Sequence, residues 1–169
     1  MIIPGLVFAS SKKSFMETLK EFPLPDKEII SIRDVNAEIP FVFKAWTNPV
    51  HLQRWWGPKG FTNTFNDFNI SAGGRWSFVM HGPDGTNYVN ECVFVEVVEP
   101  SLVSFDHLSD PVFRGTASFA ALTKGVTRIT YTMQFETNEI RDKMEQFITE
   151  KNEELFDRLE NELIQMKQG

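Results

Sequence analysis

Hydrophobic and polar residues alternate along the central part of the chain, with a period of two from about residue 61 to residue 135. In the segment 75–81, Trp76, Phe78 and Met80 fall on one side and Arg75, Ser77 and Val79 on the other. Apolar runs of this kind, separated by turn residues, predict strands at 27–38, 62–70, 75–81, 87–98, 102–108, 112–122 and 126–135. The last strand has one apolar and one polar face, which indicates an antiparallel sheet that is covered on one side only.

A helical period follows at the C-terminal end of the chain. Residues 138–167 carry an apolar stripe that is formed by Ile140, Met144, Phe147, Ile148, Leu155, Leu159, Leu163 and Met166. The stripe predicts one long helix that covers the sheet. Glu154 and Arg158 are expected to form an ion pair on the outer side of this helix.

The apolar stripe has a gap between Ile148 and Leu155. The inward positions there fall on Lys151 and Asn152. This polar pair either lies exposed beyond the edge of the sheet or points into a wet cavity, where it would contact the polar end of a ligand. The sequence leaves both interpretations open.

Two short helices are predicted between the first and second strands, at 41–47 and 50–55, because a proline stands at the start of each. The order is therefore one strand, two short helices, six strands and a long helix. It predicts an α+β fold in which a curved antiparallel sheet of about six to seven strands wraps around the C-terminal helix. We expect the domain to span residues 26–169, and residues 1–25 to be an N-terminal appendage with a short helix.

Four segments carry a resemblance to a known family. They are VFKAWTNPVHLQRWWGPKGF (42–61), AGGRWSFVMHGPDG (72–85), EVVEPSLVSF (96–105) and DRLENEL (157–163). With these segments the chain resembles the START-like (SRPBCC) superfamily and, within it, the homologues of the activator of heat-shock-protein ATPase. The resemblance covers about residues 28–164 and implies a helix-grip fold.

The resemblance also implies a cavity for a hydrophobic ligand between the sheet and the long helix. Members of the superfamily bind lipids, sterols, polyketides or plant hormones, some are cyclases or dehydratases, and a few are co-chaperones. Fold alone does not select among these functions. Relatives often carry a Gly-Trp or Gly-Met pair in the middle of the last helix, where this chain has Glu150, Lys151 and Asn152. A relative's ligand is therefore not transferred to this chain.

The candidate ligand-binding residues are mostly aromatic and lie on predicted apolar faces. Trp55 and Trp56 end the second short helix, and they either plug one end of the sheet or form a gate at the mouth of a cavity. The other candidates, which either line the cavity or simply fill the core, are Trp76, Phe78, Met80, Phe119, Tyr131, Met133, Phe147 and Lys151.

Candidate catalytic chemistry is sparse. The chain has no phosphate-binding loop and no nucleophile-elbow motif. Glu91 is a candidate acid or base if it faces inward, and His81 and His107 close two strands. No spacing of histidines and carboxylates predicts a metal site, and no cofactor is predicted. The sequence favours a binding protein over an enzyme without deciding between them.

Composition narrows the choice of partner. The net charge of −6 disfavours nucleic acid and anionic membrane surfaces, and no apolar run reaches the roughly 20 residues of a membrane span. A single cysteine excludes an internal disulfide and is typical of a cytoplasmic protein. With 13% aromatic residues, the sequence predicts a cytoplasmic protein that binds a hydrophobic or aromatic small molecule. Two alternative functions remain open: a stimulator of a heat-shock ATPase with a chaperone partner, and a cyclase or dehydratase. A lipid-binding or stress-response role and a homodimer also remain open.

Overall fold

The computed structural model describes residues 27–169. The predicted N-terminal appendage at residues 1–25 lies outside the described residues. The elements follow the predicted order and are β1 (Glu28–Val35), α2 (Ile39–Thr47), α3 (Pro49–Trp55), β2 (Thr62–Phe68), β3 (Arg75–His81), β4 (Asn87–Val98), β5 (Leu102–His107), β6 (Phe113–Thr123), β7 (Val126–Phe135) and α4 (Asn138–Gln168).

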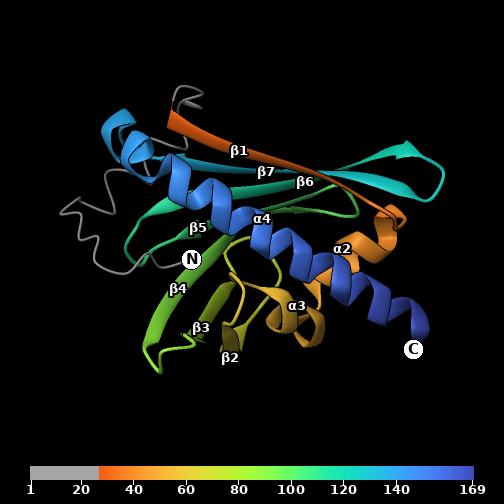
Figure 1. Cartoon of the computed structure of the whole chain (residues 1–169), viewed down its shortest axis with the longest axis horizontal. Coiled ribbons are helices and arrows are strands. Elements are labelled where there is room, and N and C mark those ends of the chain that lie inside the picture. The colour runs from red at the N-terminus through yellow and green to blue at the C-terminus, as the bar shows by residue number, and fades with distance from the viewer. Residues whose placement is uncertain (1–26) are drawn as a thin grey trace.

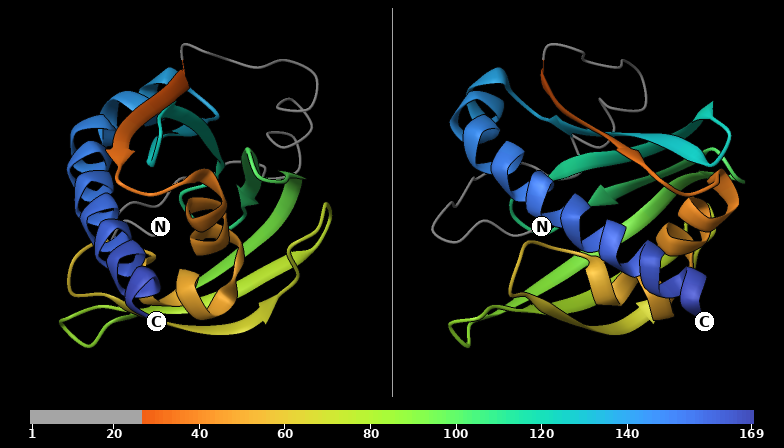
Figure 2. Two further views of the ribbon diagram at one scale, coloured as in Figure 1. Left: turned by 90° about the vertical axis from the view of Figure 1, so that its right-hand side faces the viewer. Right: turned by 45° about the vertical axis from the view of Figure 1, so that its right-hand side comes forward.

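The seven strands form one antiparallel sheet in the order β1-β7-β6-β5-β4-β3-β2. The first strand therefore returns to pair with the last one, and β1 and β2 lie at opposite edges of the sheet. Register shifts in the β2–β3, β4–β5 and β6–β7 pairs mark irregularities of the kind that bend a sheet. The sheet curves around α4, α2 and α3, which all lie on its inner side (Figures 1 and 2). This arrangement confirms the predicted helix-grip fold.

Local sequence signals account for the helix starts. The Asn48 side chain accepts a hydrogen bond from the backbone N–H of Val50 at the start of α3, at 2.9 Å. Thr137 does the same for Ile140 at the start of α4, at 3.2 Å. Because these side chains satisfy backbone donors that have no partner within a helix, they fix where each helix begins.

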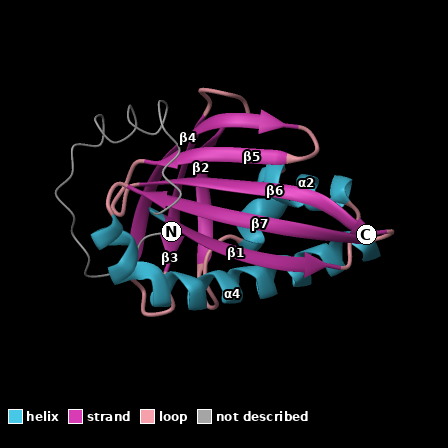
Figure 3. Cartoon of the chain, turned by 90° about the horizontal axis from the view of Figure 1, so that it is seen from above, coloured by secondary structure: helices cyan, strands magenta, loops and turns pink. Residues whose placement is uncertain are grey.

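The long helix α4 runs beside β1 and crosses toward the ends of α2 and α3 (Figure 3). Five residues of the predicted stripe are buried, and they are Met144, Ile148, Leu155, Leu159 and Leu163. Asn152, Phe156 and Glu162 are buried as well, whereas Phe147 of the predicted stripe is exposed. The core therefore lies between this helix and the concave face of the sheet. Within residues 27–169, none of the helices is long and apolar enough to cross a membrane.

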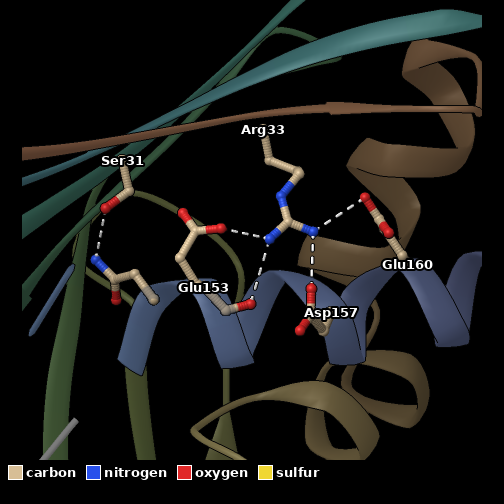
Figure 4. A network of polar contacts seen from close by, with 6 residues as sticks. Ser31, Arg33, Glu153, Asp157 and Glu160 are labelled. Carbon is tan, nitrogen blue, oxygen red and sulfur yellow. Dashed lines mark hydrogen bonds and ion pairs between the residues drawn. The ribbon is translucent and has the colours of Figure 1, made fainter. Parts of the chain in front are cut away.

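The inner face of β1 differs from the rest of the sheet. Ile30 and Ile32, which helped to predict this strand, are 54% and 53% exposed, because they point away from α4. The inward positions carry the buried Ile29 and Val35, with Ser31 and Arg33 between those two. Arg33 binds the carboxylates of α4 residues Glu153, Asp157 and Glu160 at 2.6, 2.9 and 3.2 Å (Figure 4). The contact between β1 and α4 is thus partly ionic.

Candidate functional site

Eight of the predicted ligand-binding residues come together in the interior, and none of them exposes more than 4% of its surface. They lie at the end of α3 and on β3, β6 and β7, and they are Trp55, Trp56, Trp76, Phe78, Met80, Phe119, Tyr131 and Met133. The strands bring these residues to one place because β3, β6 and β7 each turn their apolar face toward the helices.

Trp56 lies at the centre of this group. Its ring centroid is 5.1 Å from that of Trp76, 5.8 Å from that of Trp46 and 6.3 Å from that of Tyr131. Phe105 lies at 5.9 Å and Trp55, whose indole is held by α2, at 5.6 Å. We call Trp46, Trp56, Trp76, Phe105 and Tyr131 the aromatic cluster, which forms one continuous set of ring contacts between the sheet and the short helices.

Two members of the aromatic cluster, Trp46 and Phe105, were not among the predicted site residues. Trp46 lies one helical turn after Val42, and both are buried, so the apolar face of the predicted short helix was the available signal. Phe105 lies in a strand whose residues from Val103 to His107 are all buried. Alternation does not single out the inward positions of a strand that is covered on both faces.

Three tryptophans of the interior carry a buried indole nitrogen without a hydrogen-bond partner among the described residues: Trp46, Trp56 and Trp76. The indole of Trp55 differs, because its Nε1 donates to the carbonyl oxygen of Ala45 at 3.0 Å. Buried polar groups are nearly always paired with protein or with ordered water. The unpaired indoles therefore mark an interior that offers hydrogen bonds it does not use itself.

The polar pair in the middle of α4 divides between two environments. Asn152 is fully buried, and its Nδ2 donates to Ser31 Oγ at 3.0 Å, while its Oδ1 has no partner in the described part of the chain. Lys151 is half-buried, binds Glu154 Oε1 at 2.8 Å, and lies 5.8 Å from the ring centroid of Phe147. Phe147 is 37% exposed. Of the helix residues, Asn152 therefore contributes to the interior, whereas the predicted candidates Phe147 and Lys151 lie toward the surface.

A short path of contacts joins Asn152 to the aromatic cluster. Its Nδ2 lies 3.7 Å from the sulfur of Met133 on β7. In the backbone register of the sheet, Met133 stands opposite Gly115 on β6. A Cβ added at Gly115 would lie 2.6 Å from Phe105 Cζ, so the missing side chain makes room for that ring. These contacts connect Asn152 to β7 and β6, and β7 also carries Tyr131 of the aromatic cluster.

Arg158 of α4 holds the chain that follows Trp55. Its guanidinium donates to the carbonyl oxygens of Arg54, Trp56, Gly57 and Pro58 at 2.8 to 3.0 Å. The predicted ion pair between Arg158 and Glu154 is therefore wrong, because the carbonyls at the end of α3 take all of these contacts and Glu154 binds Lys151 instead. Gly57 has a φ of 91°, and a Cβ there would lie 2.4 Å from Met80 Cε.

The candidate acids and bases do not gather in the aromatic cluster. Glu91 forms an exposed ion pair with Arg75 at 2.9 Å. His81 is bound at the surface by Thr64 and Asn87. His107 is buried, and its Nδ1 and Nε2 contact the oxygens of Pro111 and Asn90 at 2.9 and 2.8 Å.

Two further titratable side chains, Cys92 and Tyr131, are buried in the interior. Burial raises the pKa of the Cys92 thiol to about 12, so this thiol stays protonated near neutral pH. Burial also raises the pKa of the Tyr131 hydroxyl. Within residues 27–169, no three metal-ligating side chains of the histidine, cysteine and carboxylate types lie together.

A surface groove of about 790 Å³ lies beside the aromatic cluster, between the short helices, the β2–β3 turn and the end of β4. Phe43, Lys44, Ile70 and Val97 contribute to its walls. Phe43 also contacts Phe119 inside, with ring centroids 6.2 Å apart, so its ring separates the groove from the interior. None of the predicted ligand-binding residues lines this groove.

Comparisons with known proteins identify the family and the fold. Residues 36–163 match the family model described as Activator of Hsp90 ATPase homolog 1-like protein. No curated protein sequence matches the chain.

Solved structures give the same picture of the fold. Protein NE0264 from Nitrosomonas europaea is 21% identical, with a TM-score of 0.79, over 87% of this chain and 100% of that one. A protein from Arthrobacter aurescens is 26% identical, with a TM-score of 0.77, over 85% of this chain and 90% of its own. The AHSA1 protein SPO3351 from Silicibacter pomeroyi is 19% identical, with a TM-score of 0.67, over 82% and 99% of the two chains.

Proposed function

Since the chain belongs to the Activator of Hsp90 ATPase homolog 1-like family, we propose that it binds a hydrophobic or aromatic small molecule between its sheet and α4. The observation that carries this proposal is the set of unpaired polar atoms in the interior. Three indole nitrogens and the Asn152 amide oxygen are buried there without a partner among the described residues. A bound molecule would supply the missing hydrogen bonds.

The energetic argument rests on what an unpaired group costs. A buried donor or acceptor without a partner destabilises a protein by about 1–3 kcal/mol. A bound molecule or ordered water would remove this cost at the three indoles and the Asn152 oxygen. A few polar atoms in a mostly apolar, aromatic surrounding are typical of small-molecule sites.

Apolar contact would supply most of the affinity. Each buried methylene contributes about 0.8 kcal/mol, so an eight-carbon group gains roughly 6 kcal/mol before the costs of ordering are subtracted. Methionines suit such a site because their flexible side chains adapt to ligand shape. Met80 and Met133 both contribute to this interior.

The groove beside Phe43 offers a route into the interior. A rotation of the Phe43 ring away from Phe119 would join the groove to the region around Trp46, which lies 5.7 Å from Phe119. In this proposal Phe43 is the gate, whereas Trp55 and Trp56 form inner walls. Because Trp55 Nε1 donates a hydrogen bond to the Ala45 carbonyl oxygen, the ring of Trp55 is held more firmly than that of Trp56.

A panel of apolar compounds tests the proposal on the full chain. Fatty acids, sterols and small polycyclic aromatics are titrated while tryptophan emission and thermal unfolding are followed. We expect at least one class to quench the emission saturably and to raise the melting temperature. Unchanged emission and an unchanged melting temperature with all three classes would contradict the proposal.

Other roles stay predictions. Stimulation of a heat-shock ATPase rests on the family description, and an ATPase assay with the host chaperone decides it. A cyclase or dehydratase would need an acid or base in the interior, where Glu91 and His81 do not lie. His107, the third candidate, is buried and stacks on Phe113 with ring centroids 4.7 Å apart, so it is the residue on which this alternative rests. A cytoplasmic location is proposed from the single cysteine, and a homodimer awaits a mass measurement in solution.

A further inference from the structure

Among the unpaired polar atoms of the interior, hydrogen-bond donors outnumber acceptors, and this excess of donors indicates the chemistry of the ligand. An indole Nε1–H donates and does not accept, so Trp46, Trp56 and Trp76 together offer three donors. Two buried acceptors also lack a partner in the described chain, Asn152 Oδ1 and the Oδ1 of Asn63, whose Nδ2 donates to the Trp56 carbonyl oxygen. We propose that the ligand is an apolar molecule with a neutral carbonyl group, whose oxygen accepts hydrogen bonds from these indoles. This inference rests on the proposed function.

The indoles are close enough for shared recognition. Trp56 lies between the other two, with ring centroids 5.8 Å from Trp46 and 5.1 Å from Trp76. A carbonyl oxygen has two lone pairs and accepts two hydrogen bonds. One carbonyl is therefore able to satisfy two of the three donors.

The ligand's acceptor is expected to be neutral. A buried carboxylate needs a cation, because an unpaired buried charge costs far more than an unpaired neutral group. The cations beside the interior are already engaged. Arg158 donates to four backbone carbonyls, and Arg33 holds three carboxylates of α4. A ketone, ester or quinone fits these surroundings, whereas a fatty acid in its ionised form does not.

Trp55 shows that burial in this region does not by itself leave an indole unpaired. It is as buried as Trp56 and Trp76, at 1% exposure, yet it donates to the Ala45 carbonyl at 3.0 Å. Its N–H therefore serves as an internal control. A ligand carbonyl should affect the other indoles and leave the Trp55 N–H unchanged.

Two compounds of nearly the same size and shape isolate the carbonyl. Tetralin is a hydrocarbon, and 1-tetralone differs from it by one carbonyl oxygen in place of two hydrogens. Each is titrated into the full chain labelled with nitrogen-15, and the four indole N–H resonances are followed by NMR. Single Trp→Phe variants assign the resonances. Isothermal titration calorimetry on the same samples gives the affinities.

We expect 1-tetralone to bind about tenfold or more tightly than tetralin, because each hydrogen bond in place of an unpaired donor favours the ketone. At least one of Trp46, Trp56 and Trp76 should shift downfield with 1-tetralone, and Trp55 should not. Equal affinities with no indole shift would overturn the carbonyl inference and leave the proposed function standing. Binding of neither compound would overturn the inference, and the apolar panel would then decide the proposed function separately.

Water is the other candidate partner of the indoles. Magnetisation transfer between the indole N–H groups and long-lived water, measured with 1-tetralone bound, distinguishes it from the ligand. We expect the transfer to fall at the indole that shifts. Full transfer at all three indoles in the saturated complex would show that water is their partner and would overturn the inference.

Discussion

Asn152 gives the sharpest test of whether the interior is built for stability or for binding. Its amide oxygen is buried without a partner in the described chain, while its Nδ2 binds Ser31 Oγ at 3.0 Å. The unpaired oxygen costs about 1–3 kcal/mol, and the Ser31 hydrogen bond contributes about 1 kcal/mol. The double variant Ser31→Ala/Asn152→Leu removes both groups together. We expect it to be about 1 kcal/mol more stable than the natural chain.

The assay is urea unfolding of the ligand-free protein, with a ligand titration of the same samples. Asn161→Leu, at an exposed position of α4, controls for the higher helix propensity of leucine. It should change the free energy of unfolding by about half a kcal/mol or less. The single variant Ser31→Ala should destabilise the fold, because it leaves Asn152 Nδ2 with only the Met133 sulfur at 3.7 Å. The double variant should also bind apolar ligands with altered affinity.

A double variant that is less stable than the natural chain by more than about 1 kcal/mol would refute this reasoning. In a filled core, the larger leucine side chain would overpack the site, at a cost of about 1–3 kcal/mol. Unchanged ligand affinity together with that loss would mean that Asn152 serves the fold alone.

Other predictions concern the elements around the site. Arg158→Met removes hydrogen bonds to four backbone carbonyls and should lower the free energy of unfolding by about 3 kcal/mol, measured in urea, with a shift in tryptophan emission. Gly57→Ala places a Cβ 2.4 Å from a methionine methyl group at a φ of 91°, and should cost about 2 kcal/mol or more. Phe43→Ala should speed ligand association in stopped-flow measurements, because it removes the ring between groove and interior. The hydrogen bond from Lys151 holds the pKa of the Glu154 carboxyl below its usual value. The ionised carboxylate therefore stabilises the fold above the pKa that Glu154 has in the unfolded chain, and this stabilisation is lost as pH falls through the lower pKa of the folded state. In urea unfolding at several pH values, Glu154→Gln should show a smaller loss of stability on the acid side.

Matched changes show which outcomes would contradict these four expectations. Arg75→Met removes an exposed ion pair with Glu91 and should be nearly neutral, so an equal loss in both arginine variants would argue against the carbonyl contacts. Gly125→Ala has a φ of 77° but open space around it, and should cost less than Gly57→Ala. Phe41→Ala changes an exposed ring and should leave the association rate unchanged. If Glu154→Gln left the pH dependence of the free energy of unfolding unchanged, the Lys151 hydrogen bond to Glu154 would not stabilise the fold as argued.

The order of elements was predictable from the sequence because each strand and helix carries its own period. The bounds of β3, β4 and β7 agree with the predicted ranges to the residue. β1 was predicted as a strand, but its inner face was not, because that face mixes apolar and polar residues. Ile29 and Val35 are buried there, and Arg33 between them binds the carboxylates of α4. The exposed Ile30 and Ile32 of β1 therefore carried a misleading apolar signal.

The candidate site was predictable only in part. Alternation on β3 and β7 pointed to Trp76 and Tyr131, which lie in the aromatic cluster. The sequence did not indicate which tryptophans would find a partner, because the bond from Trp55 to Ala45 depends on how α2 and α3 pack. The role of Arg158 was missed for the same reason, since its partners are backbone carbonyls roughly a hundred positions away in the sequence.

The most direct test of a ligand-binding interior is a fluorescence titration of the full chain with N-phenyl-1-naphthylamine, a neutral apolar probe that accepts energy from tryptophan. We expect the energy transfer to saturate at one probe molecule per chain. In the aromatic cluster Trp46 and Trp76 lie 5.8 and 5.1 Å from Trp56, so one probe bound there is close to all three tryptophans. The carbonyl inference adds that 1-tetralone displaces the probe. Energy transfer that rises with probe concentration without saturating in the folded protein would contradict a ligand-binding interior.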